Sequence, residues 1–244
     1  MLATLSGAEL LYSAAVLAVA FFVQGLAGFG SGLIAIPLLV FVLPLQFAVP
    51  LSLALTYVTA VSHGLRSQRH VRWREMLPLM PFSMAGVVLG LIILKTASVA
   101  AMSHALGTFV VLFAVYQFMG VEFAGRYSKG WAVLAGGSGG VIGTVFGTGG
   151  PFYVIYFRLR GLDKTEMRAT IAATFLVDGG WRLVGFGAAG YYTRDFLIAM
   201  VAALPVMVAA FYVGSRTHMR MSQQSFQRAI SVLLAISGLA LLTK

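Results

Sequence analysis

Long apolar segments alternate with short polar or basic segments along the whole chain. Apolar runs of about 20 residues are long enough to cross a membrane as helices, and they lack the strict alternation of outer-membrane barrel strands. The pattern therefore predicts an all-α integral membrane protein. Two of the predicted segments, 31–43 and 152–157, are too short to cross a bilayer comfortably. The predicted segments are 9–27, 31–43, 47–62, 76–94, 99–121, 131–146, 152–157, 169–186, 196–214 and 229–242.

Two glycine-rich stretches interrupt the apolar pattern, at 25–37 (GLAGFGSGLIAIP) and at 136–151 (GGSGGVIGTVFGTGGP). Glycine lacks a Cβ, so the backbone can bend there and approach another group closely. A bend inside a bilayer exposes amide groups, and it is tolerated only where protein or a water-filled cavity covers them. Two such interruptions in corresponding halves of a membrane chain are typical of a transporter's binding site.

The two halves of the chain align at a shift of about 119 residues, as expected for transporter repeats. GFGSG at Gly28 overlays GTGGP at Gly147, and LALTYVTAVSHG at Leu53 overlays IAATFLVDGGWR at Ile171. We therefore predict an N-terminal repeat at 1–121, a cytoplasmic linker at 122–130 and a C-terminal repeat at 131–244. Each repeat is expected to hold about five membrane segments, with a glycine-rich broken or re-entrant pair at the midplane.

Basic residues outnumber acidic ones by 17 to 7, which gives a net charge of +10, although only 10% of the chain is charged. In a soluble chain this balance would suggest a nucleic-acid partner. In a membrane chain it matches the basic loops that remain in the cytoplasm, so no nucleic-acid partner is predicted. Placing the basic loops inside puts both termini outside and makes the two repeats inverted. These loops are 63–75, 122–130, 158–168 and 215–228.

Candidate catalytic chemistry is missing from the sequence. The chain has no cysteine, and its four histidines show no metal-binding spacing. Paired carboxylates, a nucleophile triad and a nucleotide-binding loop are also missing, so we predict neither an enzyme nor a bound cofactor or metal. The first basic residue is Arg66, and the apolar N-terminus is therefore predicted to be a membrane segment rather than a cleaved signal peptide.

The glycine-rich stretches predict a site for a small anion. A helix that begins within the membrane presents free N–H groups and the positive end of its dipole, which together bind anions without a basic side chain. Hydroxyl groups, including that of Thr144, can complete the shell. The alternative is that the small residues serve close helix packing. The predicted substrate-binding residues are Gly28, Gly30, Ser31, Gly32, Thr56, Gly147, Thr148, Gly149, Gly150 and Thr174.

Asp178 and Arg182 are charged residues inside a predicted membrane segment. Their i, i+4 spacing predicts an ion pair on one helix face. Charges in a membrane span are costly and indicate function by default, so we predict a role in gating or proton coupling. The alternative is that the pair only steadies the outer end of the span. Protons and sodium both stay open as the coupling ion.

The glycine motifs resemble a known family. GLAGFGSGLIAIPLL and HGLRSQRHVRWREMLPLMPFSMAGVVLG resemble the sulfite exporter TauE/SafE family, also described as toluene sulfonate uptake permeases, and GGVIGTVFGTGGPFYVIYFRLRGLDKTEMRAT resembles its repeated motif. The resemblance covers nearly the whole chain. In the second copy Pro151 and Tyr156 replace the glycine and proline of the first, so the two hairpins are expected to differ. The family's glycine motif falls on Gly25, Gly28, Gly30, Gly32 and Pro37, and on Gly143, Gly147, Gly149 and Gly150.

The resemblance implies a multi-pass protein of the bacterial inner membrane that moves sulfite, sulfonates or similar sulfur-containing anions, whereas the residues alone indicate only a small anion. We expect a secondary transporter that works by alternating access, in contact with the lipid bilayer. An anion channel and a membrane partner subunit that transports nothing are the alternatives.

Overall fold

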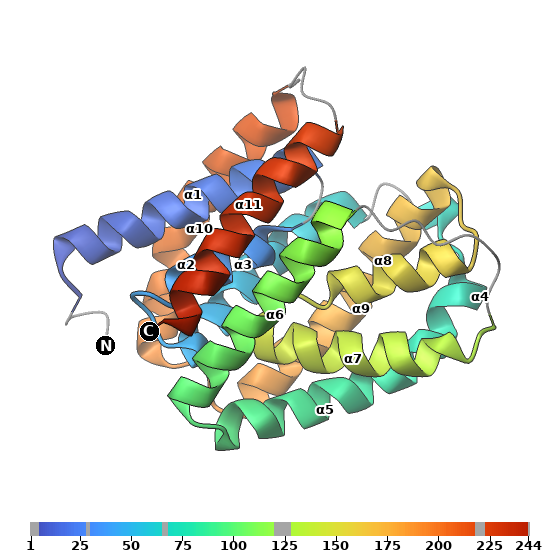
Figure 1. Cartoon of the computed structure of the whole chain (residues 1–244), viewed down its shortest axis with the longest axis horizontal. Coiled ribbons are helices and arrows are strands. Elements are labelled where there is room, and N and C mark those ends of the chain that lie inside the picture. The colour runs from blue at the N-terminus through green and yellow to red at the C-terminus, as the bar shows by residue number, and fades with distance from the viewer. Residues whose placement is uncertain (1–4, 28–29, 65–67, 120–127, 218–222, 244) are drawn as a thin grey trace. The chain divides into compact units, whose positions relative to one another are not determined.

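The computed structural model describes residues 5–27, 30–64, 68–119, 128–217 and 223–243, and every regular element in these ranges is a helix (Figure 1). This confirms the predicted all-α class. In chain order the elements are α1 (Gly7–Ala27), α2 (Ser31–Leu39), α3 (Leu45–Gly64), η2 (Gln68–His70), α4 (Trp73–Met76), η3 (Leu77–Leu79), α5 (Met80–Thr96), α6 (Val99–Met119), α7 (Trp131–Phe146), α8 (Gly150–Leu159), α9 (Lys164–Ala188), α10 (Arg194–Arg216) and α11 (Gln223–Leu242).

The helix bounds follow the apolar pattern with three clear differences, the first being that α11 begins at Gln223, six residues before the predicted segment 229–242. The predicted segment 31–43 ends early, because α2 stops at Leu39 and continues as a turn. The predicted loop 158–168 is largely helical, because α9 already begins at Lys164. The side chain of Asp163 accepts hydrogen bonds from the backbone N–H groups of Thr165 and Glu166. In turn, the Glu166 carboxylate accepts a hydrogen bond from the backbone N–H of Asp163. This capping box starts the helix within a basic, polar stretch.

Four helical stretches in the described ranges are long and apolar enough to cross a membrane. Their outward side chains are large and apolar; Val88, Leu89 and Ile92 of α5, for example, are each more than half exposed. Such a surface is unfavourable in water and suits the hydrocarbon of a bilayer, which indicates a multi-pass membrane protein. The four stretches are Gly7–Leu26, Trp73–Thr96, Val99–Tyr116 and Arg194–Arg216, and shorter apolar helices cover Leu45–Val61, Trp131–Phe146 and Ser231–Leu242.

The chain divides into two compact units that each take helices from both halves of the sequence. Unit 1 comprises Met1–Leu55, Ala97–Val121 and Tyr192–Lys244, and unit 2 comprises Thr56–Thr96 and Glu122–Tyr191. Helix α3 contributes residues to both. The units therefore do not coincide with the predicted repeats at 1–121 and 131–244, and the division into repeats stays a prediction.

Unit 1 is built on two close helix pairs, α1 with α10 and α6 with α11, and α2 packs against α1 and α11. Glycine lets the backbones of the first pair touch: a Cβ on Gly25 would lie 2.5 Å from the carbonyl oxygen of Phe211. The Tyr12 hydroxyl of α1 also donates a hydrogen bond to the Leu38 carbonyl of α2, at 3.1 Å. Small residues at helix crossings are the usual basis of packing in membranes.

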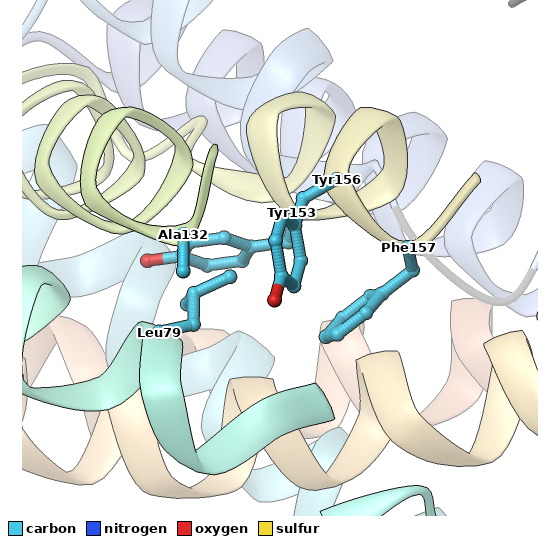
Figure 2. Close-up of a cluster of buried hydrophobic side chains, with 5 residues drawn as sticks. All are labelled: Leu79, Ala132, Tyr153, Tyr156 and Phe157. Atoms are coloured by element: carbon cyan, nitrogen blue, oxygen red, sulfur yellow. The ribbon is translucent and has the colours of Figure 1, made fainter. Parts of the chain in front are cut away.

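Unit 2 is built on the pair α5 and α7, which lie side by side (Figure 1), with α8 packed against α7 and α9 packed against α5 and α8. A Cβ on Gly86 would lie 2.5 Å from the carbonyl oxygen of Gly137, so glycine is required at this crossing. Helix α8 fills the interior of the unit with three aromatic side chains. Figure 2 shows the resulting cluster of Leu79, Ala132, Tyr153, Tyr156 and Phe157, all fully buried.

Candidate functional site

The second glycine-rich stretch breaks the chain between α7 and α8. Gly147 ends α7 with a φ of 65°, in the left-handed region that glycine adopts without strain. Gly149 precedes α8, and Pro151 occupies the start of α8, where a proline nitrogen costs no hydrogen bond. No side chain caps the first turn of α8. The break therefore places a helix start without a side-chain cap next to the buried residues Thr148 and Gly149.

A buried ion pair on α9 lies against this break. The Nη2 atom of Arg182 is 2.5 Å from Oδ2 of Asp178, and the two side chains are 4% and 1% exposed. The same Nη2 donates hydrogen bonds to the Gly139 carbonyl oxygen at 3.0 Å and to the Tyr153 hydroxyl at 3.2 Å. The predicted ion pair is thus present, and it lies in the protein interior rather than at an exposed helix end.

Glycines of the break make the room that the Arg182 guanidinium occupies. A Cβ on Gly143 would overlap the guanidinium, and a Cβ on Gly149 would lie 2.7 Å from Nη2. A Cβ on Gly139 would run into the Tyr153 ring. One turn away, a Cβ on Gly136 would lie 2.5 Å from the Leu79 carbonyl oxygen, at the crossing with the α5 side. On α7 some glycines therefore serve helix packing and others make room for Arg182, while the anion site stays a prediction.

A hydroxyl network connects the ion pair to α5 and α8. The Ser83 hydroxyl donates a hydrogen bond to Oδ1 of Asp178 and lies 3.1 Å from the Tyr153 hydroxyl. Sequence reasoning missed Ser83 and Tyr153. The only signal for them was a polar side chain within an apolar segment, which does not reveal its partner.

Three buried polar atoms at this place lack a hydrogen-bond partner: the Thr148 hydroxyl, Nε of Arg182 and Oδ2 of Asp178, which contacts Nη2 of Arg182 as an ion pair without a hydrogen bond. Thr148 is 3% exposed. Buried polar groups are nearly always paired, so an unpaired one is a candidate contact for a ligand, a water or an ion. In contrast, Thr144 and Thr174 donate hydrogen bonds to the carbonyls of Gly140 and Thr170 in their own helices. Thr148 is therefore the predicted hydroxyl that is free to bind a ligand.

The first glycine-rich stretch lies in unit 1 and carries no such charge. Gly30 precedes α2 with a φ of 99°, and a Cβ there would meet nothing within 4 Å. Ser31 is buried and Gly32 half-buried, whereas Gly28 lies outside the described residues. Thr56, in α3, is half-buried. Among the buried residues that the structure describes, Asp178 and Arg182 are the charged ones. Unit 2 thus gathers Gly147–Gly150, Asp178 and Arg182, while convergence of the two stretches on one anion stays a prediction.

Ion pairs of Arg72 and Arg160 lie near the C-terminal end of α8. Nε of Arg160 lies 2.6 Å from Oε2 of Glu75, and this hydrogen bond raises the pKa of Arg160. Arg72 forms an ion pair with Glu166 of α9, and its backbone N–H donates to the Thr170 hydroxyl at 3.0 Å. The segment before α5 is thereby tied to the end of α8 and to the start of α9.

Several apolar helices around a buried charged site beside a broken helix are typical of secondary membrane transporters. The family pattern described as "Sulfite exporter TauE/SafE" matches residues 12–241. "Probable inner membrane transporter protein TsaS" of Comamonas testosteroni is 27% identical over 181 residues, which cover 73% of this chain and 76% of that protein. "Probable sulfite/organosulfonate exporter TauE" of Cupriavidus necator is 24% identical over 175 residues, which cover 70% of this chain and 68% of that protein. No solved structure gives a significant match.

The chain belongs to the sulfite exporter TauE/SafE family. This confirms the family that the glycine motifs indicated. Members of an exporter family are transporters rather than enzymes, in agreement with the lack of catalytic motifs in the sequence.

Proposed function

We propose that the protein is a secondary transporter that moves sulfite, organosulfonates or similar sulfur-containing anions across the bacterial inner membrane by alternating access. The names of the family and of the two relatives support this substrate class. The observation that carries the proposal is the buried Arg182 guanidinium, held in a glycine-lined space at the start of a broken helix. Neutral side chains in place of a buried ion pair are often as stable or more stable. A buried cation at this position therefore supports a functional role.

The anionic head of the substrate would bind between Arg182, the Thr148 hydroxyl and the start of α8. A guanidinium presents its N–H groups in a planar fork that matches two oxygens of an oxyanion. The Thr148 hydroxyl supplies a further donor, and the N-terminal end of α8 supplies the favourable end of its dipole. Gly147, Gly149 and Gly150 allow the backbone to come close to the anion, and Thr174 lies one turn before Asp178 on α9.

The first stretch would complete the site through Gly28, Gly30, Ser31 and Gly32, with Thr56, if the halves are inverted repeats. Helix pairing supports such repeats. Under the predicted shift, α1 corresponds to α7 and α10 corresponds to α5, so the pair α1–α10 in unit 1 is the counterpart of the pair α7–α5 in unit 2. In both pairs, glycines allow the two helix backbones to approach closely. The charge distribution supports the inverted arrangement, with both termini outside and the basic loops inside.

Asp178 and Arg182 would also act as a gate. In the empty site the carboxylate satisfies the guanidinium, so the charge is not left unpaired. A bound anion takes over that role, which gives loaded and empty states different internal contacts, as alternating access requires.

The first test is thermal stabilisation of the purified protein by sulfite, sulfate, thiosulfate, taurine, methanesulfonate, chloride and phosphate. A ligand at about 100 times its Kd stabilises the folded state by about 2.7 kcal/mol. We expect selective stabilisation by sulfite or a sulfonate, lost in Arg182→Gln. No shift with any sulfur anion would overturn the proposal. In proteoliposomes, flux that never saturates would favour the channel, and purified protein that moves nothing would favour the partner subunit.

A further inference from the structure

We infer that the substrate anion and a proton bind together at this site, because the anion displaces the Asp178 carboxylate from Arg182 and Asp178 then takes up a proton. The inference rests on the proposed function, since it requires an anion at Arg182. It goes further by naming the group that binds the proton and the contact that couples proton to anion.

The geometry of the guanidinium makes the Asp178 carboxylate and the substrate anion compete for contact with Arg182. An oxyanion held by two parallel hydrogen bonds uses the edge of the guanidinium that carries Nε and Nη2. Nε is buried and has no hydrogen-bond partner, whereas Nη2 lies 2.5 Å from Oδ2 of Asp178 and donates hydrogen bonds to the Gly139 carbonyl and the Tyr153 hydroxyl. The substrate can therefore occupy this edge fully only when Asp178 moves away from Nη2 and Nη2 turns a hydrogen from the Gly139 carbonyl or the Tyr153 hydroxyl toward the substrate.

A released carboxylate could not stay charged where it is. Asp178 is almost completely buried, and an ionised carboxylate without a partner is far less stable in such surroundings than a neutral acid. Its remaining neighbours suit either form. Ser83 donates to Asp178 in the structure, and a hydroxyl can equally accept a hydrogen bond from a protonated acid while donating to the Tyr153 hydroxyl.

Other charges around α9 do not offer Asp178 a second cation within the described residues. Helices α4, α5 and α8 and turn η2 pack against α9. Toward Asp178, α5 presents Ser83 and α8 presents Tyr153. Arg72, next to α4, pairs with Glu166, about three turns toward the start of α9. Turn η2 carries Arg69 and His70, the Tyr57 hydroxyl of α3 would lie 3.3 Å from a Cβ on Gly180, and α7 has no titratable side chain. Proton uptake is therefore the available way to neutralise Asp178.

The balance of charge follows directly. A monovalent sulfonate brings one negative charge to Arg182, and the proton taken from water neutralises one negative charge on Asp178. The loaded site has the same net charge as the empty site. We therefore expect one proton to cross with each monovalent sulfonate, in the same direction, so that transport responds to a pH gradient and not to membrane potential.

The test measures protons taken up on binding of methanesulfonate, which remains ionised and cannot carry the proton itself. Calorimetric titrations of the purified full chain in two buffers of different ionisation enthalpy give the number of protons bound per anion. For the wild type we expect about one proton taken up per anion bound. Over the pH range in which this holds, the apparent affinity for the anion should fall about tenfold for each unit by which the pH is raised.

Asp178→Asn is the decisive variant, and Asp163→Asn is its matched control. Asp163 carries the same chemistry on the same helix, but it is an exposed N-cap whose capping role asparagine also fills. We expect Asp178→Asn to bind methanesulfonate without proton uptake and to lose its response to a pH gradient in proteoliposomes. Asp163→Asn should behave like the wild type.

Each outcome decides between the two proposals. If the wild type binds the anion without taking up a proton, the coupling is wrong and the proposed anion site stands. If Asp178→Asn still takes up one proton, the proton is assigned to the wrong group. If the wild type binds neither methanesulfonate nor sulfite, the proposed function itself fails. The wild-type titration decides the coupling even if Asp178→Asn does not fold.

Discussion

The two glycine-rich breaks differ in what surrounds them. At the first, Gly30 adopts a left-handed conformation with free space around it, and α2 follows as a short, buried helix. At the second, the space next to Gly143 and Gly149 is filled by the Arg182 guanidinium, which is held by Asp178. In the predicted alignment of the halves, Asp178 overlays Ala60 of α3. Within the described residues, a similar glycine pattern therefore lies beside a buried ion pair in the second half and beside no buried charge in the first.

This difference separates backbone geometry from side-chain chemistry. Both breaks allow a helix to begin inside the protein, and this is the part that the glycine motif encodes. The charge comes from another helix, α9, and the glycines of α7 only make room for it. We therefore expect the second break to dominate anion affinity and the first to contribute mainly shape. The following predictions test this order, from the largest expected effect to the smallest.

Arg182→Gln should have the largest effect. It leaves the buried Asp178 carboxylate without its cation, and breaking a buried pair in this way costs about 3–5 kcal/mol. We expect that loss in the free energy of unfolding in detergent, together with loss of anion-induced stabilisation and of transport in proteoliposomes.

The double variant Asp178→Asn with Arg182→Gln separates stability from function. Removing both charges leaves a neutral amide pair, which should restore most of the unfolding free energy. Anion binding and transport should stay lost, because the guanidinium is still missing. Recovery of transport by the neutral pair would show that Arg182 has a structural role and does not bind the substrate.

Gly143→Ala should weaken anion binding strongly, whereas Gly137→Ala on the same helix should not. The new methyl group at Gly143 would occupy the position of the Arg182 guanidinium, and at Gly137 it would meet nothing within 4 Å. Overpacking costs about 1–3 kcal/mol, while replacing glycine in an open helix position gains up to about 1 kcal/mol. Thermal unfolding of both variants without sulfite measures the two stability changes, and unfolding with sulfite measures the effect on anion binding. Equal behaviour of the two variants would argue that Arg182 does not depend on this space.

Gly30→Ala tests the first break, where the constraint is backbone conformation and not space. Alanine at a φ of 99° should cost roughly 1–2 kcal/mol, the usual cost of a left-handed residue with a Cβ. Gly30→Asn should cost less, because asparagine tolerates this region better. Chemical unfolding of the two variants gives the comparison. We expect only a modest change in sulfite affinity, and a loss as large as that in Gly143→Ala would remove the proposed difference between the breaks.

Local signals in the sequence predicted the helices and the ion pair, and distant contacts could not be predicted. The predicted segment 131–146 matches α7 because glycines bound it on both sides. Asp178 and Arg182 were predicted to pair because they are four residues apart on one helix. Ser83, in contrast, is 95 residues from Asp178 and 70 from Tyr153. No local pattern encodes such a meeting, which depends on how α5, α8 and α9 pack.

Thr148→Val should have the smallest effect, and it is also the most specific test of the site. The Thr148 hydroxyl is buried without a hydrogen-bond partner, so replacing it with an apolar group of the same shape should leave the empty protein as stable as before or slightly more stable. If the hydroxyl binds the anion, the free energy of binding should weaken by about 0.5–1.5 kcal/mol, roughly a 2- to 13-fold loss of affinity.

Thr144→Val is the matched control, because the Thr144 hydroxyl already donates to the Gly140 carbonyl within its own helix. Its loss should lower stability slightly and leave affinity for the anion unchanged. Titration of both variants with sulfite and methanesulfonate distinguishes them. The two changes are chemically identical, so opposite effects on stability and affinity would place the anion beside Thr148. Unchanged affinity in Thr148→Val would place the substrate elsewhere along the Arg182 edge.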